Sequence, residues 1–289
     1  MNANPIEQIA GKGNLPLLKV QTPWSAAEIY LHGAHITHFQ KNGETPLLFM
    51  SPQSWFAADK PIRGGIPICF PWFGSREGGP SHGLARILAW DLAESSVAPD
   101  GSVKLHLKLP QKLLSAEWAA LRTEFIVTIG ATLTMELIVT NESTDKTIEI
   151  ENCLHHYFHI GEIDAVSITG LRGSMYLDNS AAGKGEMKTD NEPVLIISKE
   201  TNRLYLDTTN AVEIRDEKLR RLIRVEKTNS KSSVVWNPWT TQKMPEDYAP
   251  ENHKKMVCVE SGNIKQNKIP LAPGQTNALK VILSSAPLK

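Results

Sequence analysis

Apolar and polar residues alternate with a period of two through much of this sequence, whereas apolar residues at helical spacing are scarce. The segment VKLHLKL at 103–109 alternates strictly, and so does TLTMELIV at 132–139. The segment 27–39 indicates two short strands broken at Gly33. Further strands are predicted at 147–151, 166–169, 194–197, 204–206, 211–214, 222–225, 233–236, 256–260 and 279–283.

The connections between these segments indicate how the strands are arranged. Clusters of Gly, Pro, Asn and Asp separate most of the predicted strands, as expected of antiparallel sheets. One segment, 111–121, has helix-like apolar spacing and is predicted to be a short helix. A dozen or more short strands with almost no βαβ alternation predict an all-β fold, a large β-sandwich in one domain that spans residues 1–289.

Composition excludes several classes of protein. The 31 basic residues balance 31 acidic ones, which argues against nucleic acid or an anionic membrane as a partner. Cys69, Cys153 and Cys258 form an odd set without metal-ligand spacing, so neither a disulfide framework nor a structural zinc site is predicted. No signal peptide or membrane span is recognised, and we expect a soluble, cytoplasmic protein. Anion specificity must therefore come from a few local basic side chains.

Two segments in the first third of the chain suit a small-molecule site. RGGIPICFPWFG at 63–74 places Arg63 before two glycines that allow close backbone approach, and its aromatic residues suit the apolar face of a pyranose. HGLAR at 82–86 supplies His82 and Arg86, and two guanidinium groups can bind one anion together. Taken singly, the first segment is better explained as a structural turn with buried aromatic residues, and two arginines so far apart in the sequence are most often unrelated surface charges.

Two later segments carry candidate acid–base groups. ENCLHHYF at 151–158 contains His155 and His156, which face opposite sides of an extended segment, so that one of them can enter a given pocket. The segments VVWNPW at 234–239 and VCVESG at 257–262 supply Trp236 and Glu260, a carboxylate after a buried apolar run. Alone, such a histidine is more often a packed, hydrogen-bonded core residue than a catalyst, and the glutamate is equally the partner of a structural arginine.

Together these segments resemble the hexose-6-phosphate epimerase branch of the aldose 1-epimerase superfamily. RGGIPICFPWFG, HGLAR, LHHYF, VVWNPW and VCVESG occur in that family's order, and 27–39 resembles its opening strands. The resemblance implies a galactose mutarotase-like supersandwich, a single domain of large, mostly antiparallel sheets. It implies interconversion of the α and β anomers of a sugar such as glucose 6-phosphate by a monomer, with no cofactor and no metal.

The resemblance also assigns residues. It implies His155 as the catalytic acid and Glu260 as the base, with His156 at a variable position. It implies Arg63 and Arg86 as phosphate ligands, and His82 and Trp236 as sugar contacts. Where the family often has Thr-Asp-Arg, this chain has Asn202 between Thr201 and Arg203, so a carboxylate acceptor for sugar hydroxyls is replaced by an amide.

The expected mechanism requires two proton transfers at one hemiacetal carbon. A base removes the C1 hydroxyl proton while an acid protonates the ring oxygen, and the same groups reverse these steps after rotation about C1–C2. On this assignment His155 starts protonated beside the Glu260 carboxylate. The alternatives are a noncatalytic carbohydrate-binding protein on the same scaffold, a mutarotase for an unphosphorylated aldose, and a glycosidase or lyase, which needs a second site carboxylate.

Overall fold

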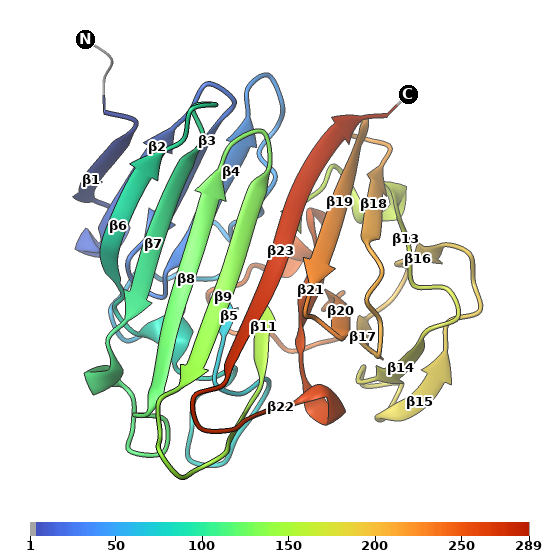
Figure 1. Ribbon diagram of the computed structural model, residues 1–289. Helices are drawn as coiled ribbons and strands as arrows, with labels where there is room; N and C mark the ends of the chain where they lie inside the picture. The colour runs from blue at the N-terminus through green and yellow to red at the C-terminus, as the bar shows by residue number, and fades with distance from the viewer. Residues whose placement is uncertain (1–3, 289) are drawn as a thin grey trace.

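The computed structural model describes residues 4–288 as an all-β fold in which four sheets pack in layers (Figure 1). The largest sheet has nine strands in the order β16 (Leu195–Ile196), β13 (Val166–Thr169), β18 (Val212–Asp216), β19 (Arg221–Thr228), β23 (Thr276–Pro287), β9 (Leu133–Asn141), β8 (Leu121–Ile129), β7 (Val103–Leu109) and β6 (Asp91–Val97). Its strand pairings are antiparallel.

The second large sheet lies behind the first in Figure 1. Its order is β15 (Glu186–Thr189), β14 (Met175–Asp178), β17 (Thr201–Leu206), β20 (Ser232–Asn237), β21 (Met256–Asn263), β11 (Asn152–Leu154) and β5 (Ile68–Cys69), and β12 (Tyr157–His159) also pairs with β21. One smaller sheet has four strands in the order β1 (Ile6–Ala10), β2 (Pro16–Gln21), β3 (Ser25–Tyr30) and β4 (His35–Lys41). The other pairs β10 (Ile148–Ile150) with β22 (Ile269–Leu271). Short 3-10 helices occupy Lys12–Asn14, Ala85–Ile87, Gln111–Leu113, Ile163–Ala165, Pro250–Lys254 and Lys265–Asn267.

The two large sheets differ in how their strands are buried. β7 alternates between buried and more accessible residues along its length, as its sequence pattern predicts, and its buried face joins the main hydrophobic core. β20 and β21 are buried at every position. One face of these two strands packs on the core through Val235 and Val259, while the other face carries Val234, Trp236 and Glu260. This second face is the floor of the candidate site.

Most of the predicted strands are confirmed, among them 103–109, 166–169 and the interrupted pair around Gly33. The helix predicted at 111–121 is wrong. Only Gln111–Leu113 is helical, as a 3-10 turn, and further single turns lead to β8. The amides of Leu114, Trp118 and Leu121 each bond to a carbonyl three residues earlier. Successive turns therefore bury these three apolar residues at helix-like spacing without an α-helix.

The predicted fold class is confirmed: the described residues form large antiparallel sheets and contain no α-helix. None of the helices in residues 4–288 is long and apolar enough to cross a lipid bilayer. The assignment of residues 1–289 to one domain stays a prediction, and residues 1–3 and 289 lie outside the described residues.

Candidate functional site

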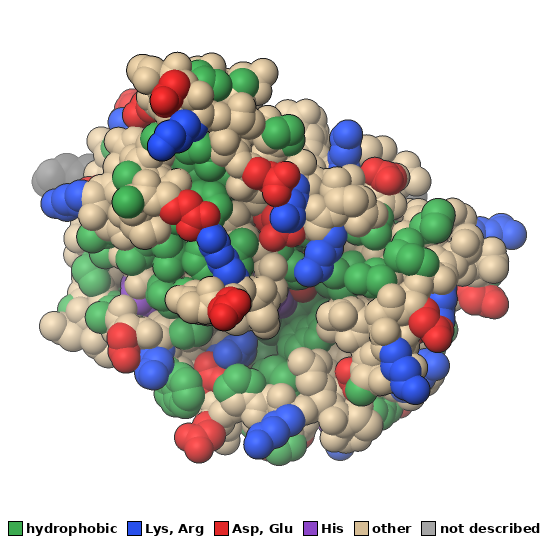
Figure 2. Space-filling model, turned by 90° about the horizontal axis from the view of Figure 1, so that it is seen from below, with side chains coloured by type: hydrophobic (Ala, Val, Ile, Leu, Met, Phe, Trp, Pro, Cys, Tyr) green, Lys and Arg blue, Asp and Glu red, His purple; other side chains and the backbone are tan. Residues whose placement is uncertain are grey.

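A cavity of about 550 Å³ opens over the face of the second large sheet that carries Glu260. Seen from below, the molecule is hollowed near its centre, with charged side chains of both signs around the hollow (Figure 2). The cavity brings together all seven site residues predicted from the sequence, which are Arg63, His82, Arg86, His155, Asn202, Trp236 and Glu260. Glu260 is the only carboxylate that lines it within the described part of the chain.

His155 and Glu260 meet because both strands that flank the histidine pair with β21. Leu154 lies opposite Ser261, and Tyr157 lies opposite Cys258. The imidazole Nε2 of His155 consequently lies 3.2 Å from Oε1 of Glu260, and both side chains are buried. His156 faces the other way, and its Nδ1 lies 3.0 Å from the carbonyl oxygen of Val259. Of the two histidines, only His155 reaches the cavity, in keeping with the alternation expected of an extended segment.

Aromatic side chains fix the orientation of His155. Its ring stacks on that of Tyr157, with centroids 4.6 Å apart and an interplanar angle of 12°. The rings of His82 and Trp236 approach it edge-on at 5.7 Å and 6.1 Å. Such packing leaves the imidazole few alternative rotamers, which favours a constant geometry relative to Glu260.

Burial sets the protonation of the pair. Desolvation lowers the pKa of His155 well below its ordinary value, and the neighbouring His82 and Arg86 lower it further. Desolvation raises the pKa of Glu260 well above its ordinary value, although a hydrogen bond from Cys153 and the charge of Arg86 oppose this. Both shifts favour the uncharged forms of the two groups, a neutral imidazole and a protonated carboxyl group. The expectation that His155 starts protonated stays a prediction, and burial acts against it.

Of the two arginines, Arg63 is paired with a carboxylate, whereas within residues 4–288 Arg86 is not. The Nε of Arg63 donates to Oδ2 of Asp247 at 3.2 Å, and Asp247 is fully buried. Arg86 donates through Nη2 to the carbonyl oxygen of Ser81, and its buried Nε has no hydrogen-bond partner. Among the described residues no ion pair joins Arg86 to a carboxylate. A buried guanidinium without a counter-ion is costly in free energy, and an anionic ligand in the cavity would offset that cost.

His82 is held at the wall between these groups. Its backbone adopts the left-handed region, with φ of 63°, and its Nδ1 accepts the backbone N–H of Gly74 at 3.3 Å. Burial, together with the charges of Arg86 and Arg63, lowers the pKa of His82 to about 3. The ring is therefore neutral with Nδ1 as acceptor, and its proton lies on Nε2 as a hydrogen-bond donor.

Trp236 and Asn202 lie side by side on neighbouring strands of the floor, because they are opposite one another in the register of β17 and β20. The indole Nε1 of Trp236 donates to Oε1 of Gln242 at 3.0 Å, which fixes both the ring and the loop above it. The amide of Asn202 is half-buried and lines the cavity at the position where the family often has Asp.

Several residues of the site carried no recognised signal in the sequence. Tyr157 stacks on His155, Asp247 pairs with Arg63, and Cys153 contacts the catalytic-site carboxylate, with its Sγ 3.6 Å from Oε2 of Glu260. Lys243 and Lys265 add two further cations to the lining. The position of Tyr157 could have been predicted from the sequence, because it is two residues after His155 and an extended segment places both side chains on one face.

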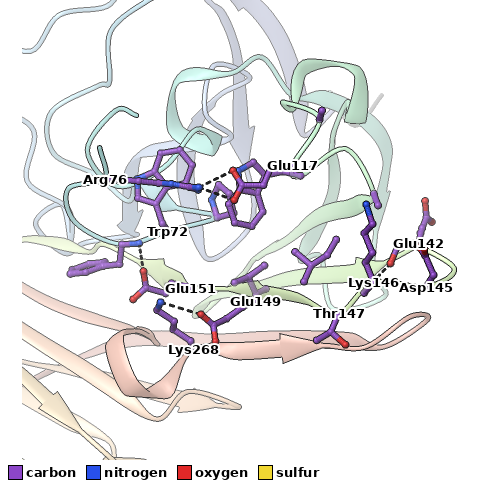
Figure 3. Close-up of a pocket in the computed structure, with 18 of the residues that line it drawn as sticks. Trp72, Arg76, Glu117, Glu142, Asp145, Lys146, Thr147, Glu149, Glu151 and Lys268 are labelled. Atoms are coloured by element: carbon purple, nitrogen blue, oxygen red, sulfur yellow. Dashed lines mark hydrogen bonds and ion pairs between the residues drawn. The ribbon is translucent and has the colours of Figure 1, made fainter. Parts of the chain in front are cut away.

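A second cavity is larger, about 1080 Å³, and shares Phe73, Ser75 and Lys265 with the first (Figure 3). Arg76 lies over the ring of Trp72 and donates twice to Glu117, at 2.7 and 2.8 Å. The charged pairs of this groove are substantially exposed, and none of the predicted site residues lines it. We therefore regard the smaller cavity as the functional site despite its size.

The sequence pattern of the family described as aldose 1-epimerase matches residues 16–284. The chain belongs to the aldose 1-epimerase family. Members of this family are isomerases, and the match covers the strands that carry the cavity as well as those of the nine-stranded sheet.

Relatives agree with this membership over most of the chain. A protein of Escherichia coli K12 is 33% identical over 254 residues, covering 86% of this chain and 83% of its own length, and is named "Putative glucose-6-phosphate 1-epimerase". A protein of Cenchrus ciliaris with the same name is 30% identical over 271 residues, covering 90% and 82%. The crystal structure of a "putative mutarotase" from Salmonella typhimurium has a TM-score of 0.87 at 26% identity, covering 99% of this chain and 95% of its own.

Proposed function

We propose that this protein interconverts the α and β anomers of a hexose 6-phosphate, with glucose 6-phosphate as the first candidate. The observation that carries the proposal is a buried, uncompensated Arg86 in the same cavity as an imidazole–carboxylate pair. The names of the relatives point to the same substrate class.

The cavity has the charge that a phosphosugar requires. Four cationic side chains line it, which are Arg63, Arg86, Lys243 and Lys265, against the single carboxylate of Glu260. Arg63 is paired with Asp247, whereas Arg86 is buried and forms no ion pair among the described residues, so Arg86 is the buried cation that a bound anion would stabilise most. A phosphate dianion held there fixes the far end of the sugar, and this binding energy lowers the entropic cost of orienting C1 at the pair.

His155 and Glu260 supply the two proton transfers. As a carboxylate, Glu260 removes the proton from the C1 hydroxyl, and as an imidazolium, His155 protonates the ring oxygen, so that the C1–O5 bond opens. After rotation about C1–C2, the same two groups reverse the transfers on the other face of the aldehyde. Each group of this kind contributes about 100- to 10,000-fold to the rate.

The uncharged forms that burial favours are compatible with this reaction, because the pair needs only one proton. Neutral His155 with protonated Glu260, and imidazolium with carboxylate, contain the same number of protons and interconvert by transfer across the 3.2 Å contact. A bound phosphate neutralises Arg63 and Arg86, both of which lower the pKa of His155 in the free protein. The substrate itself therefore favours protonation of the imidazole.

The proposal is tested by exchange NMR of the anomers of glucose 6-phosphate and of glucose at equal concentrations. We expect exchange to be accelerated for both sugars and kcat/KM to be higher for the phosphorylated one. Tight binding of glucose 6-phosphate without faster exchange would instead indicate a carbohydrate-binding protein. Equal kcat/KM values would exclude the phosphate specificity while leaving the epimerase activity standing.

A further inference from the structure

Cys258, a side chain that the proposed epimerase reaction does not use, lies close to His155 and Glu260. Cys258 lies two residues before Glu260 on β21, so both side chains emerge on the same face of the sheet. The Sγ of Cys258, the Nε2 or Nδ1 of His155 and a carboxylate oxygen of Glu260 all lie within 4.8 Å of one another. All three residues are buried.

We propose that His155, Cys258 and Glu260 form an inhibitory site for a thiophilic divalent cation such as Zn²⁺ or Cd²⁺. Thiolate, imidazole and carboxylate are the three ligand types that proteins use for zinc, and the thiolate selects against Mg²⁺ and Ca²⁺. Two of the three ligands, His155 and Glu260, line the cavity, so a cation can reach them from it. The inhibition rests on the proposed function, whereas the binding of the cation does not.

Two of the three ligand atoms already have the spacing of coordination, and the sulfur of Cys258, within 4.8 Å of both, would have to move closer on binding. The 3.2 Å separation of His155 Nε2 and Glu260 Oε1 is about that between neighbouring ligands of a tetrahedral zinc ion, since each ligand atom is about 2 Å from the metal. Cys258 and Glu260 are held by the pairing of β21 with β20, and the ring of His155, which lies between β11 and β12, is stacked on Tyr157. The thiol of Cys153 contacts the other oxygen of Glu260 at 3.6 Å, as an outer partner of a liganding carboxylate does.

Charge decides which cations can enter. Arg86 and Arg63 repel any cation, so a weakly held ion would not remain. Coordination releases the proton of the Cys258 thiol and that of the Glu260 carboxyl group to solvent, and the two anionic ligands then balance the two charges of the metal.

Binding of a cation at these three residues would inhibit the proposed reaction. A cation bound to these three residues occupies the nitrogen and the oxygen that transfer protons to and from the sugar. Metal and sugar therefore exclude one another, and Zn²⁺ acts as a competitive inhibitor rather than as a cofactor.

The binding test uses Cd²⁺ alone as the probe, titrated into the full-length protein after treatment with a chelator. We expect a sulfur-to-metal charge-transfer absorption that saturates at one equivalent. Cys258→Ala removes the sulfur ligand and should abolish this absorption. Cys69→Ala is the matched control, because Cys69 is an equally buried thiol outside the three ligands, and it should behave as the wild type.

The activity test follows anomer exchange of glucose 6-phosphate with increasing Zn²⁺. The wild type and Cys69→Ala should be inhibited reversibly, with recovery of activity on adding EDTA. Cys258→Ala should keep its basal activity. Because it has lost one of the three metal ligands, its inhibition should require at least about tenfold more Zn²⁺. If Cys258→Ala does not fold, Cys258→Ser keeps the side-chain size and should lose the Cd²⁺ absorption.

Equal inhibition of the wild type and Cys258→Ala, or a Cd²⁺ absorption that persists without Cys258, would overturn the proposal. A protein that binds Cd²⁺ through Cys258 but does not accelerate anomer exchange would instead retain the metal site and refute the proposed function. The absorption and the exchange rate thus separate the two failures.

Discussion

Two cavities share a wall in this molecule, and the smaller one contains the candidate chemistry. The larger groove contains exposed ion pairs, such as Arg76 with Glu117 and Lys268 with Glu149 (Figure 3), and its buried Glu151 accepts hydrogen bonds from the backbone amides of Phe73 and Lys265. The smaller cavity contains a buried carboxylate, a buried imidazole and a buried guanidinium without a counter-ion. Buried polar groups that lack partners cost stability, so they indicate a function more reliably than volume does.

Removing the base of the smaller cavity is the largest change we predict. Glu260→Gln keeps the shape of the side chain and abolishes its ability to take a proton, so kcat for anomer exchange of glucose 6-phosphate should fall about 100- to 10,000-fold. The measurement is exchange NMR at saturating sugar, with thermal unfolding as the control for an intact fold. A variant that retains most of the wild-type kcat would refute the role of this carboxylate.

The uncompensated arginine should control selectivity for the phosphate. Arg86→Met removes a charge-assisted contact worth about 1.5–3 kcal/mol, so kcat/KM for glucose 6-phosphate should fall about 10- to 150-fold. The value for glucose, which has no phosphate, should change little. Parallel losses on both sugars would show that Arg86 positions the ring rather than the anion.

The compensated arginine should instead control stability. Arg63→Met leaves the fully buried Asp247 without its partner and should destabilise the fold by about 3–5 kcal/mol, measured by denaturant unfolding. Arg86→Met leaves no carboxylate behind and should be neutral or stabilising. The double variant Arg63→Met/Asp247→Asn is the matched control and should recover part of the loss. A stable Arg63→Met protein would show that the ion pair does not matter to the fold.

The pH dependence should be bell-shaped, because the pair is active with one proton and inactive with none or two. Raising the pH removes that proton and leaves no acid, whereas lowering it protonates both groups and leaves no base. Each limb of log(kcat/KM) should have a slope of about one per pH unit. A profile without an acid limb would mean that no carboxylate–imidazole pair is required.

Changes in the larger groove should have the smallest effects. Glu117→Gln and Lys268→Met each break an exposed ion pair, which is worth about 0–1 kcal/mol, so stability should change by no more than that. Anomer exchange should stay within about twofold of the wild type. A large loss of activity in either variant would show that the two cavities act together on the substrate.

The fold class and seven of the residues that line the cavity were predicted from the sequence, because strand alternation and the family motifs are local patterns. It failed at 111–121, where consecutive turns bury Leu114 and Trp118 at the spacing of a helix. It also could not show that Asp247 neutralises Arg63 while Arg86 has no partner, since this depends on segments distant in the chain. Nor could it show how deeply His155 and Glu260 are buried, and this burial lowers the pKa of the imidazole and raises that of the carboxyl group.

The contacts of the cysteines likewise could not be predicted from the sequence. Their spacing in the sequence excludes a conventional metal motif, yet strand pairing brings Cys258 to within 4.8 Å of ligand atoms on a histidine more than a hundred residues earlier and on Glu260. Contacts of this kind depend on the register between β21 and its neighbours, which no local pattern specifies.

The central claim is that His155 and Glu260 act as one unit, and a double-variant cycle tests it most directly. The kcat for anomer exchange of glucose 6-phosphate is measured for the wild type, His155→Gln, Glu260→Gln and the double variant. Because acid and base act in the same step, the double variant should lose no more than the more damaged single variant. Losses that multiply would show that the two groups act independently and would contradict a shared proton at this site.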